Sequence, residues 1–203
     1  CESPWTLAAY SIEGGGSKDF KKTKNFMQDH PSALHDFLEI LCDACYRYLR
    51  QQVLSGVNAL QIFDSWADLL NAQELEIFSL QYIKKITQKL KSDPITKNIP
   101  IILFEKDPKQ KITDLIFDDL SCISLHWKND IEAISKSVKN NIAIQGNLNP
   151  MILSKSDEVI HQEVQRICSI MFEYPGFIFN LGHGITPDIN PQKVQTMIKA
   201  ARE

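Results

Sequence analysis

The sequence has little net charge and no cluster of basic residues. Its 22 Lys and Arg nearly balance 25 Asp and Glu, the formal net charge is -3, and the lysines are scattered along the chain. A protein that binds the phosphate backbone of a nucleic acid usually presents a concentrated positive field. We therefore expect no nucleic-acid partner.

Long hydrophobic runs and a leader are also missing. The longest clear apolar run, 99–104, contains Pro100 and is far shorter than the roughly 20 residues that cross a bilayer. The start has neither the basic residues nor the apolar stretch of a secretory signal, and its first residue is Cys1, not Met. We expect no membrane partner, a cytoplasmic protein, and a first residue that is a cut edge.

Cysteine is too scarce for a disulfide framework. The chain has five cysteines, an odd number: Cys1, Cys42, Cys45, Cys122 and Cys168. A chain of this length folds without such bonds, which favours a reducing compartment. Cys42 and Cys45 form a C-x-x-C, but they lie among helix-spaced leucines and have no second ligand pair. We interpret them as core residues one helical turn apart.

Several catalytic motifs are absent. The sequence has no G-x-S-x-G, no H-E-x-x-H and no paired C-x-x-C, so nucleophilic hydrolysis and zinc catalysis have no support. Glu13 is followed by three glycines and Ser17, without the spacing of a dinucleotide-binding or Walker loop. We interpret 13–17 as a flexible active-site loop.

What the sequence does contain is the composition of an ordinary globular protein, with 43% apolar and 23% charged residues. Apolar residues recur at helical spacing in some segments and form short continuous runs in others. We predict strands at 58–63, 99–104, 122–125, 142–146 and 177–181. We predict helices at 30–53, 73–90, 107–118, 131–138, from 156 onward and from 190 onward, and we interpret 5–12 as a strand exit or loop.

The strand runs are continuously apolar, as expected when helices cover both faces of a parallel sheet. Strands and helices alternate throughout, which indicates an α/β fold built from βα units. Five such strands fit an open doubly wound sheet, and they equally fit five eighths of a closed (β/α)8 barrel. The pattern alone does not separate these two folds.

Polar side chains follow each predicted strand, where parallel α/β folds place their chemistry. These residues are Asp64, Ser65, Trp66, Glu105, Lys106, Asp107, His126, Trp127, Asn147, Asn149, Asn180 and His183. Polar residues at these places also cap helices or simply face solvent. His183 is the best single candidate because the flanking Gly182 and Gly184 leave its imidazole uncrowded; the alternative is a surface-loop histidine.

The segment from Ser3 to Ser17 reads S-P-W-T-L-A-A-Y-S-I-E-G-G-G-S. It closely resembles the uroporphyrinogen decarboxylase pattern G-x-P-W-T-L-x-x-Y-x-x-E-G-G-G-S. Further segments match the family in order and spacing across almost the whole chain: Gln61 to Ser65, Ser124 to Trp127, Gln145 to Pro150, and Asn180 to Gly184 with Pro187 and Asp188.

The resemblance implies a (β/α)8 TIM barrel, of which residues 1–203 are the C-terminal part of a single domain, from the end of strand 3 through strand 8 and the C-terminal helix, with the N-terminal part missing. It implies an enzyme of haem biosynthesis that removes the four acetate carboxyl groups of uroporphyrinogen III to give coproporphyrinogen III. The family uses no metal or organic cofactor and usually forms a homodimer.

By the same resemblance, Tyr10 should hydrogen-bond the acetate being processed, Ser65 should bind a substrate carboxylate, and His183 should contact a carboxylate elsewhere on the macrocycle. Tyr10 and His183 are thus the catalytic candidates. The family also uses an aspartate on strand 2 and an arginine-rich segment after strand 1, and neither is in this sequence. We therefore expect the 203-residue chain alone to be inactive.

Two family motifs are altered. His126 stands where the family usually has Asp in Leu-Asp-Trp, and Asn149 stands where it usually has Asp in Asn-Leu-Asp-Pro. Each change removes a carboxylate at a strand end. We interpret both as changes in supporting residues, because the positions expected to touch substrate match.

Two other functions stay open. Corrinoid-dependent methyltransferases share the barrel and generally bind zinc through a His-x-Cys pair and a later Cys. Here 99–107 has no His or Cys, and Cys122 and His126 have the wrong spacing. A non-catalytic fragment or binding module is the third possibility, although nothing in the sequence marks a recognition surface.

Overall fold

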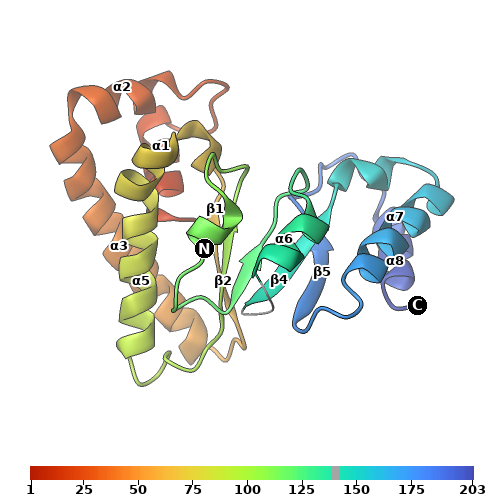
Figure 1. Cartoon of the computed structure of the whole chain (residues 1–203). Helices are drawn as coiled ribbons and strands as arrows, with labels where there is room; N and C mark the ends of the chain where they lie inside the picture. Colours follow the sequence, from red (N-terminus) through yellow and green to blue (C-terminus); the bar gives the residue numbers. More distant parts are fainter. Residues whose placement is uncertain (139–141) are drawn as a thin grey trace. The chain divides into compact units, whose positions relative to one another are not determined.

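Parallel strands, each followed by helical segments, make up the chain in the computed structural model, which describes residues 1–138 and 142–203 (Figure 1). The chain divides into two units, Cys1–Ser121 and Cys122–Glu203. Among the described residues, no helix is both long enough and apolar enough to cross a membrane.

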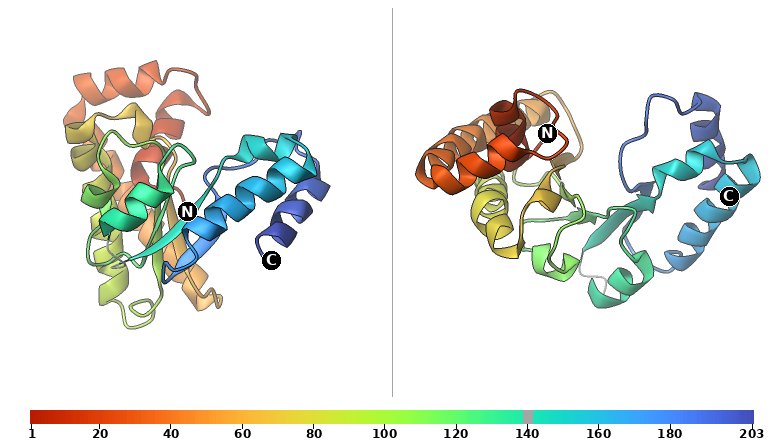
Figure 2. Two further views of the ribbon diagram at one scale, coloured as in Figure 1. Left: turned by 45° about the vertical axis from the view of Figure 1, so that its right-hand side comes forward. Right: turned by 90° about the horizontal axis from the view of Figure 1, so that it is seen from above.

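The first unit contains a pair of parallel strands and a helical layer. Its elements are α1 (Pro4–Glu13), α2 (Lys21–Asp29), α3 (Pro31–Leu54), β1 (Leu60–Asp64), η1 (Ala67–Leu69), α4 (Ala72–Leu75), η2 (Glu76–Leu80), α5 (Gln81–Ser92), β2 (Ile101–Glu105) and η3 (Ile112–Leu115). β1 and β2 pair in parallel with Asp64 opposite Glu105. Helices α3 and α5 pack on each other and lie on one side of the two strands (Figures 1 and 2).

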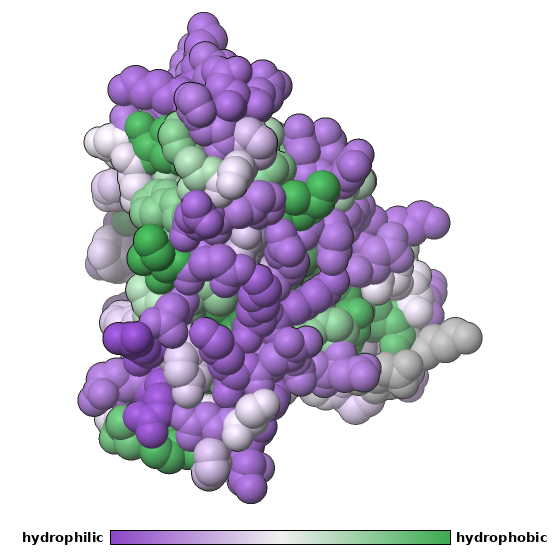
Figure 3. All heavy atoms as spheres, turned by 90° about the vertical axis from the view of Figure 1, so that its left-hand side faces the viewer, coloured by the Kyte–Doolittle hydropathy of each residue, from purple (hydrophilic) through white to green (hydrophobic). Residues whose placement is uncertain are grey.

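The core of this unit lies between the strands and these helices. Leu60, Ile62 and Asp64 of β1 are buried, whereas Phe63 is 38% exposed. Since side chains alternate across a strand, the face with Leu60, Ile62 and Asp64 is the one covered by the helical layer. On the opposite side of that layer hydrophilic residues predominate and apolar residues form small separate groups (Figure 3).

The two cysteines of the C-x-x-C are core residues, as predicted. Cys42 and Cys45 on α3 are buried free thiols, and their Sγ atoms donate to the carbonyl oxygens of Tyr82 and Glu2, each at 3.6 Å. Burial raises the pKa of each thiol to about 11. Both are therefore poor nucleophiles at neutral pH.

The second unit has three parallel strands with β4 in the centre. Its elements are β3 (Cys122–Ser124), α6 (Ile131–Val138), β4 (Ala143–Leu148), η4 (Pro150–Ser154), α7 (Asp157–Ile170), β5 (Phe177–Leu181) and α8 (Pro191–Ala200). β4 pairs with β3 on one edge and with β5 on the other. Helices α7 and α8 pack side by side (Figure 2).

In both units the strands neighbour each other in chain order. A doubly wound sheet reverses its strand order at a switch point, whereas a β/α barrel keeps chain order around its circumference. The described strands of each unit show no such reversal, as expected of a barrel.

Two sequence predictions were wrong. Segment 5–12, interpreted as a strand exit or loop, is helix α1, which begins because Ser3 Oγ accepts from Thr6 N at 3.0 Å and Pro4 suits the first turn. Segment 107–118, predicted as a helix, holds only the short 3-10 turn Ile112–Leu115. Asp107 has a φ of 46° and Pro108 follows it, so no regular helix begins there.

The sequence also missed two local features. Helix α2 was not predicted, because only Thr23 and Met27 of its nine residues are buried and no apolar stripe marks it. The predicted helix 73–90 is continuous in outline, but it contains the π-helical turn η2 between α4 and α5. An extra residue in a turn leaves the hydrophobic spacing almost unchanged, so the pattern does not reveal it.

Candidate active site

Tyr10 lies near the end of α1, beside the residues that leave β1. Its ring meets the ring of Trp66 edge-on, with 5.9 Å between centroids, and Phe20 packs on the same indole at 4.4 Å. Helix α1 ends at once, because Gly14 adopts a φ of 84° and the amides of Gly14 and Gly15 both donate to the Tyr10 carbonyl. Trp66 directly follows Ser65, so the first unit brings Tyr10 and Ser65 to the same region.

Asp64 joins the start of α1 to the end of β1. Its Oδ1 accepts from Ser3 Oγ at 2.7 Å and from Thr6 Oγ1 at 2.9 Å, and its Oδ2 accepts from Ser79 Oγ in η2. The side chain is fully buried. Burial raises the pKa of Asp64, and the hydroxyl groups of Ser79, Ser3 and Thr6 act in the opposite direction.

Backbone contacts add to this junction. The Trp66 amide donates to Thr6 Oγ1 at 3.3 Å, and the indole nitrogen of Trp5 donates to the Trp66 carbonyl at 3.0 Å. Ser3 N donates to the Phe63 carbonyl at 2.7 Å. The first turn of α1 is therefore fixed against the strand end at several points.

Ser65 already has a carboxylate partner. Its Oγ donates to Glu2 Oε2 at 2.7 Å. Burial raises the pKa of Glu2, the Ser65 hydrogen bond and the amino group of Cys1 lower it, and the nearby Asp64 charge raises it; the net shift is upward. Ser65 has one proton to donate, so a second carboxylate bound there would compete with ionised Glu2 or bind beside neutral Glu2.

A cation follows β2 in the same unit. Lys106 Nζ lies 4.2 Å from the centroid of the Trp66 ring and 3.3 Å from Asp68 Oδ2. It is about one-fifth exposed. Contact with an indole face and one carboxylate holds the ammonium group beside the aromatic cluster of Tyr10, Trp66 and Phe20.

His183 follows β5 in the second unit and is exposed. Gly184 N donates to His183 Nδ1 at 2.7 Å. Because Nδ1 accepts, the neutral ring carries its proton on Nε2.

Gly182 is required by a close approach of backbones. A Cβ added there would lie 2.3 Å from Trp127 N and 2.6 Å from Trp127 Cα. The Trp127 amide donates to the Gly182 carbonyl at 3.2 Å. Gly184, by contrast, faces open space. The sequence argument gave both glycines one role; the structure assigns Gly182 to packing.

The two altered motif positions have different surroundings. Asn149 Oδ1 accepts from Met151 N at 3.0 Å and caps η4, a role that an aspartate oxygen also fills. His126 is buried, with its ring 5.3 Å from Trp127 and 5.9 Å from His183, edge-on to the latter. The change at Asn149 thus keeps the cap, while the change at His126 puts an imidazole beside His183.

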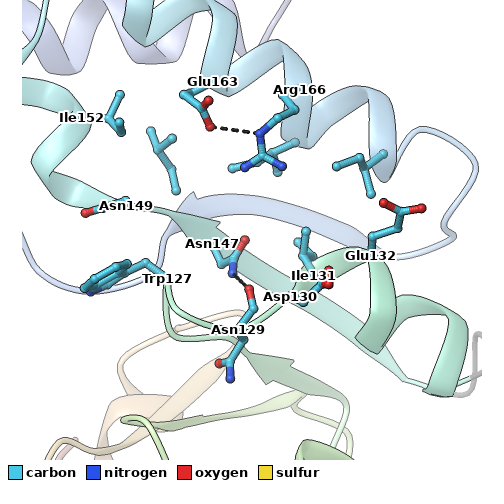
Figure 4. A pocket seen from close by; sticks show the side chains of 13 residues that line it. Trp127, Asn129, Asp130, Ile131, Glu132, Asn147, Asn149, Ile152, Glu163 and Arg166 are labelled. Carbon is cyan, nitrogen blue, oxygen red and sulfur yellow. Dashed lines mark hydrogen bonds and ion pairs between the residues drawn. The ribbon is translucent and has the colours of Figure 1, made fainter.

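A pocket of about 590 Å³ lies in the second unit between β4, the exit of β3 and α7 (Figure 4). Asn147 extends into it and donates to the carbonyls of His126 and Asn129 at 3.1 and 2.8 Å. Across it, Arg166 is ion-paired with Glu163 at 3.0 Å. His183 does not line this pocket. Nothing in the sequence distinguished Glu163 and Arg166 from other exposed helix residues.

Sequence reasoning also missed Glu2 as the partner of Ser65. Its only signal is its position directly before the Ser-Pro-Trp motif. Within residues 1–138 and 142–203, no three His, Cys, Asp or Glu side chains are grouped as a metal site would require.

Parallel βα units in chain order, with polar side chains where the strands end, define part of a β/α barrel. A solved structure with this fold is a methyltransferase from Methanosarcina mazei, which matches with a TM-score of 0.75 over 99% of this chain and 56% of that chain, at 17% identity. So low an identity supports the fold alone.

The family follows from sequence comparison. Residues 1–203 match the family Uroporphyrinogen decarboxylase (URO-D). Proteins called uroporphyrinogen decarboxylase from Hydrogenovibrio crunogenus and Pseudomonas putida strain GB-1 are 39% and 40% identical over 201 residues, which is 99% of this chain. The chain belongs to the uroporphyrinogen decarboxylase family. It spans 57% of the length of these relatives, and its fold is a partial (β/α)8 barrel, as predicted.

Proposed function

We propose that this chain is part of a uroporphyrinogen decarboxylase, which removes the four acetate carboxyl groups of uroporphyrinogen III without a cofactor and yields coproporphyrinogen III. Family membership over residues 1–203 carries the proposal. The contact of Tyr10 with Trp66 supports it, since Trp66 directly follows Ser65 and the contact brings two residues of different motifs close together.

The chemistry defines what the protein has to supply. An acetate on a pyrrole loses carbon dioxide readily once the ring is protonated, because the iminium-like ring takes up the electron pair of the broken bond. The enzyme must orient a polycarboxylate, stabilise the ring cation and provide a proton. Uncharged hydroxyl and imidazole donors suit the first of these tasks.

In this proposal Tyr10 donates a hydrogen bond to the acetate that reacts. Its ring is held by Trp66, and the sharp end of α1 at Gly14 fixes its backbone carbonyl. Few rotatable bonds and a packed ring keep the hydroxyl in one place, which lowers the entropic cost of the reactive geometry.

Ser65 binds a substrate carboxylate, and Glu2 controls how well it does so. With Glu2 neutral, the Ser65 hydroxyl is free to turn to the substrate and the Glu2 carboxyl is itself a donor. With Glu2 ionised, two carboxylates compete for one hydroxyl. Burial raises the pKa of Glu2, which extends the pH range in which it is neutral.

His183 contacts a carboxylate elsewhere on the macrocycle through Nε2. The hydrogen bond from Gly184 to Nδ1 orients the ring for this. A neutral imidazole donates one hydrogen bond, and a protonated one adds charge.

The strong carboxylate clamp comes from outside residues 1–203 in this proposal. Arg47 and Arg50 on α3 are ion-paired with Asp43 and Asp93, Arg166 is paired with Glu163, and Arg202 follows α8. None of these arginines directly follows a strand, so the bidentate binding that guanidinium groups provide requires other arginines. We also propose that the complete protein is a cytoplasmic homodimer.

The test is to incubate the complete protein with uroporphyrinogen III under reducing conditions and to separate the products by chromatography, with and without a chelator. Stepwise loss of carboxyl groups, unaffected by the chelator, supports the proposal. Substrate that remains intact would refute the proposal. Stoichiometric zinc in the purified protein, together with methyl transfer from a corrinoid, would show a methyltransferase instead.

A further inference from the structure

Asp64 and Glu105 form a buried pair of carboxyl groups beneath the candidate site. They are cross-strand neighbours at the C-terminal ends of β1 and β2. Both are at most 1% exposed. They lie on the strand face covered by the helical layer, whereas Ser65 is the next residue along and leaves on the other side.

The two carboxyl groups have unequal surroundings. Asp64 accepts hydrogen bonds from the hydroxyl groups of Ser3, Thr6 and Ser79, which occupy both of its oxygens. Among the described residues, neither oxygen of Glu105 has a hydrogen-bond donor, and the residue opposite it across the two strands is Asp64. A buried ion without donors is very costly, whereas a neutral acid that donates to a neighbouring carboxylate is not.

We propose that Glu105 is a positioning residue: it stays neutral, donates its proton to ionised Asp64, and thereby completes the network that holds α1 and Tyr10 against the β1 exit that carries Ser65. The effect on catalysis rests on the decarboxylase function proposed above. The proposed protonation state of Glu105 and the packing of α1 do not depend on that function.

The contacts give a short route from the pair to Tyr10. Asp64 holds Ser3 and Thr6 in the first turn of α1, and Tyr10 lies one turn beyond Thr6. Thr6 Oγ1 in turn accepts from Trp66 N, and Trp66 touches Tyr10. Asp64, with its three hydroxyl donors, therefore links the start of α1, which carries Tyr10, to the end of β1, which precedes Ser65.

Neighbouring charges do not offer Glu105 another partner. Lys106, the nearest cation in sequence, contacts the ring of Trp66 and forms an ion pair with Asp68. Glu2 faces Asp64 from the segment before α1 and has Ser65 as its own donor. Burial, with the Asp64 charge second, raises the pKa of Glu105 well above its usual range, in keeping with a neutral acid.

The first experiment needs no substrate. Infrared spectra of the complete protein at neutral pH, in light and heavy water, should show the carbonyl stretch of a buried protonated carboxylic acid. Glu105→Gln should remove this band, while Asp36→Asn, at an exposed acid on α3, should leave it. A band that survives when Glu105→Gln is combined with Glu2→Gln, so that Glu2 cannot contribute, or that is absent from the wild type, overturns the proposal.

The second experiment compares two isosteric changes. The amide of Glu105→Gln still donates to Asp64, so we expect kcat/KM to stay within about threefold of wild type. The amide nitrogen of Asp64→Asn cannot accept from hydroxyl groups, so we expect a loss of roughly ten- to hundredfold per folded enzyme. The reverse order of effects would place the proton on Asp64 and overturn the assignment.

A double-mutant comparison separates positioning from mere loss of stability. If Asp64 acts through Tyr10, adding Asp64→Asn to Tyr10→Phe should cost about threefold or less per folded enzyme. Full additivity would contradict the positioning role. If the wild type has no decarboxylase activity, the proposed function fails, and the infrared result still decides the protonation of the pair.

Discussion

At the residue scale, the proposed function depends on three hydrogen-bond donors. Tyr10, Ser65 and His183 were identified from motifs, and the structure adds the contacts that orient them: Trp66 for Tyr10, Glu2 for Ser65 and Gly184 N for His183. Motifs carry residue identities but not these pairings. Glu2 could not be foreseen, since no motif predicted a carboxylate as the hydrogen-bond partner of Ser65.

Removing a donor should slow the reaction without unfolding the protein. In the complete protein, we expect Tyr10→Phe and His183→Ala to lower kcat/KM by roughly ten- to hundredfold, the value of one charge-assisted hydrogen bond. Steady-state kinetics with uroporphyrinogen III, normalised by circular dichroism for folded protein, measures this. Wild-type rates in both variants would refute the assigned roles.

Glu2 should make substrate binding depend on pH. Its pKa is raised, so it is neutral below that pKa and becomes a carboxylate as the pH rises through it. The new charge repels the substrate carboxylate at Ser65, and KM should therefore increase with pH. The glutamine of the Glu2→Gln variant cannot ionise, so the ratio of wild-type KM to variant KM should rise with pH. A ratio that stays constant with pH would show that Glu2 does not face the substrate.

At the element scale, predictions succeeded where one hydrophobic pattern dominates. α6 and β5 have the predicted bounds, and α3 spans Pro31–Leu54 where the apolar stripe predicted 30–53. The errors occur where a helix cap or a turn determines whether a helix begins. Ser3 caps helix α1 in a segment that was interpreted as a strand exit or loop, and a positive φ at Asp107 prevents a helix that the spacing predicted.

The junction between the β5 exit and the β3 exit depends on Gly182. We expect Gly182→Ala to lower the free energy of unfolding by about 1 to 3 kcal/mol or more, because its Cβ would meet the backbone of Trp127. Gly184→Ala, with open space around it, is the matched control and should change stability by about 0.5 kcal/mol at most. Urea unfolding of the complete protein measures both, and equal effects would contradict the packing role.

At the scale of the whole molecule, strand count alone left a barrel and a doubly wound sheet equally open. Chain-order pairing within each unit and the family match favour the barrel. β5 shows what a partial barrel leaves uncovered: Ile178 is 42% exposed although it lies in a strand. A sequence pattern that assigns residues only to strand or helix does not predict which strand residues are exposed.

The 203-residue chain made alone should be inactive and poorly folded. Open strand edges and apolar side chains that a closed barrel covers favour aggregation, and the arginine clamp lies outside these residues in our proposal. Circular dichroism during denaturation and chromatography of porphyrin products test the two claims separately. A cooperative transition would contradict the first, and coproporphyrinogen above the no-enzyme control would contradict the second.

The measurement that tests the central claim most directly is the release of carbon dioxide from uroporphyrinogen III labelled in its acetate carboxyl groups, using the complete protein and no added cofactor. We predict four equivalents of labelled carbon dioxide per substrate, with coproporphyrinogen III as the end product and a large loss of rate in Tyr10→Phe. No labelled carbon dioxide from a folded protein would contradict the assignment.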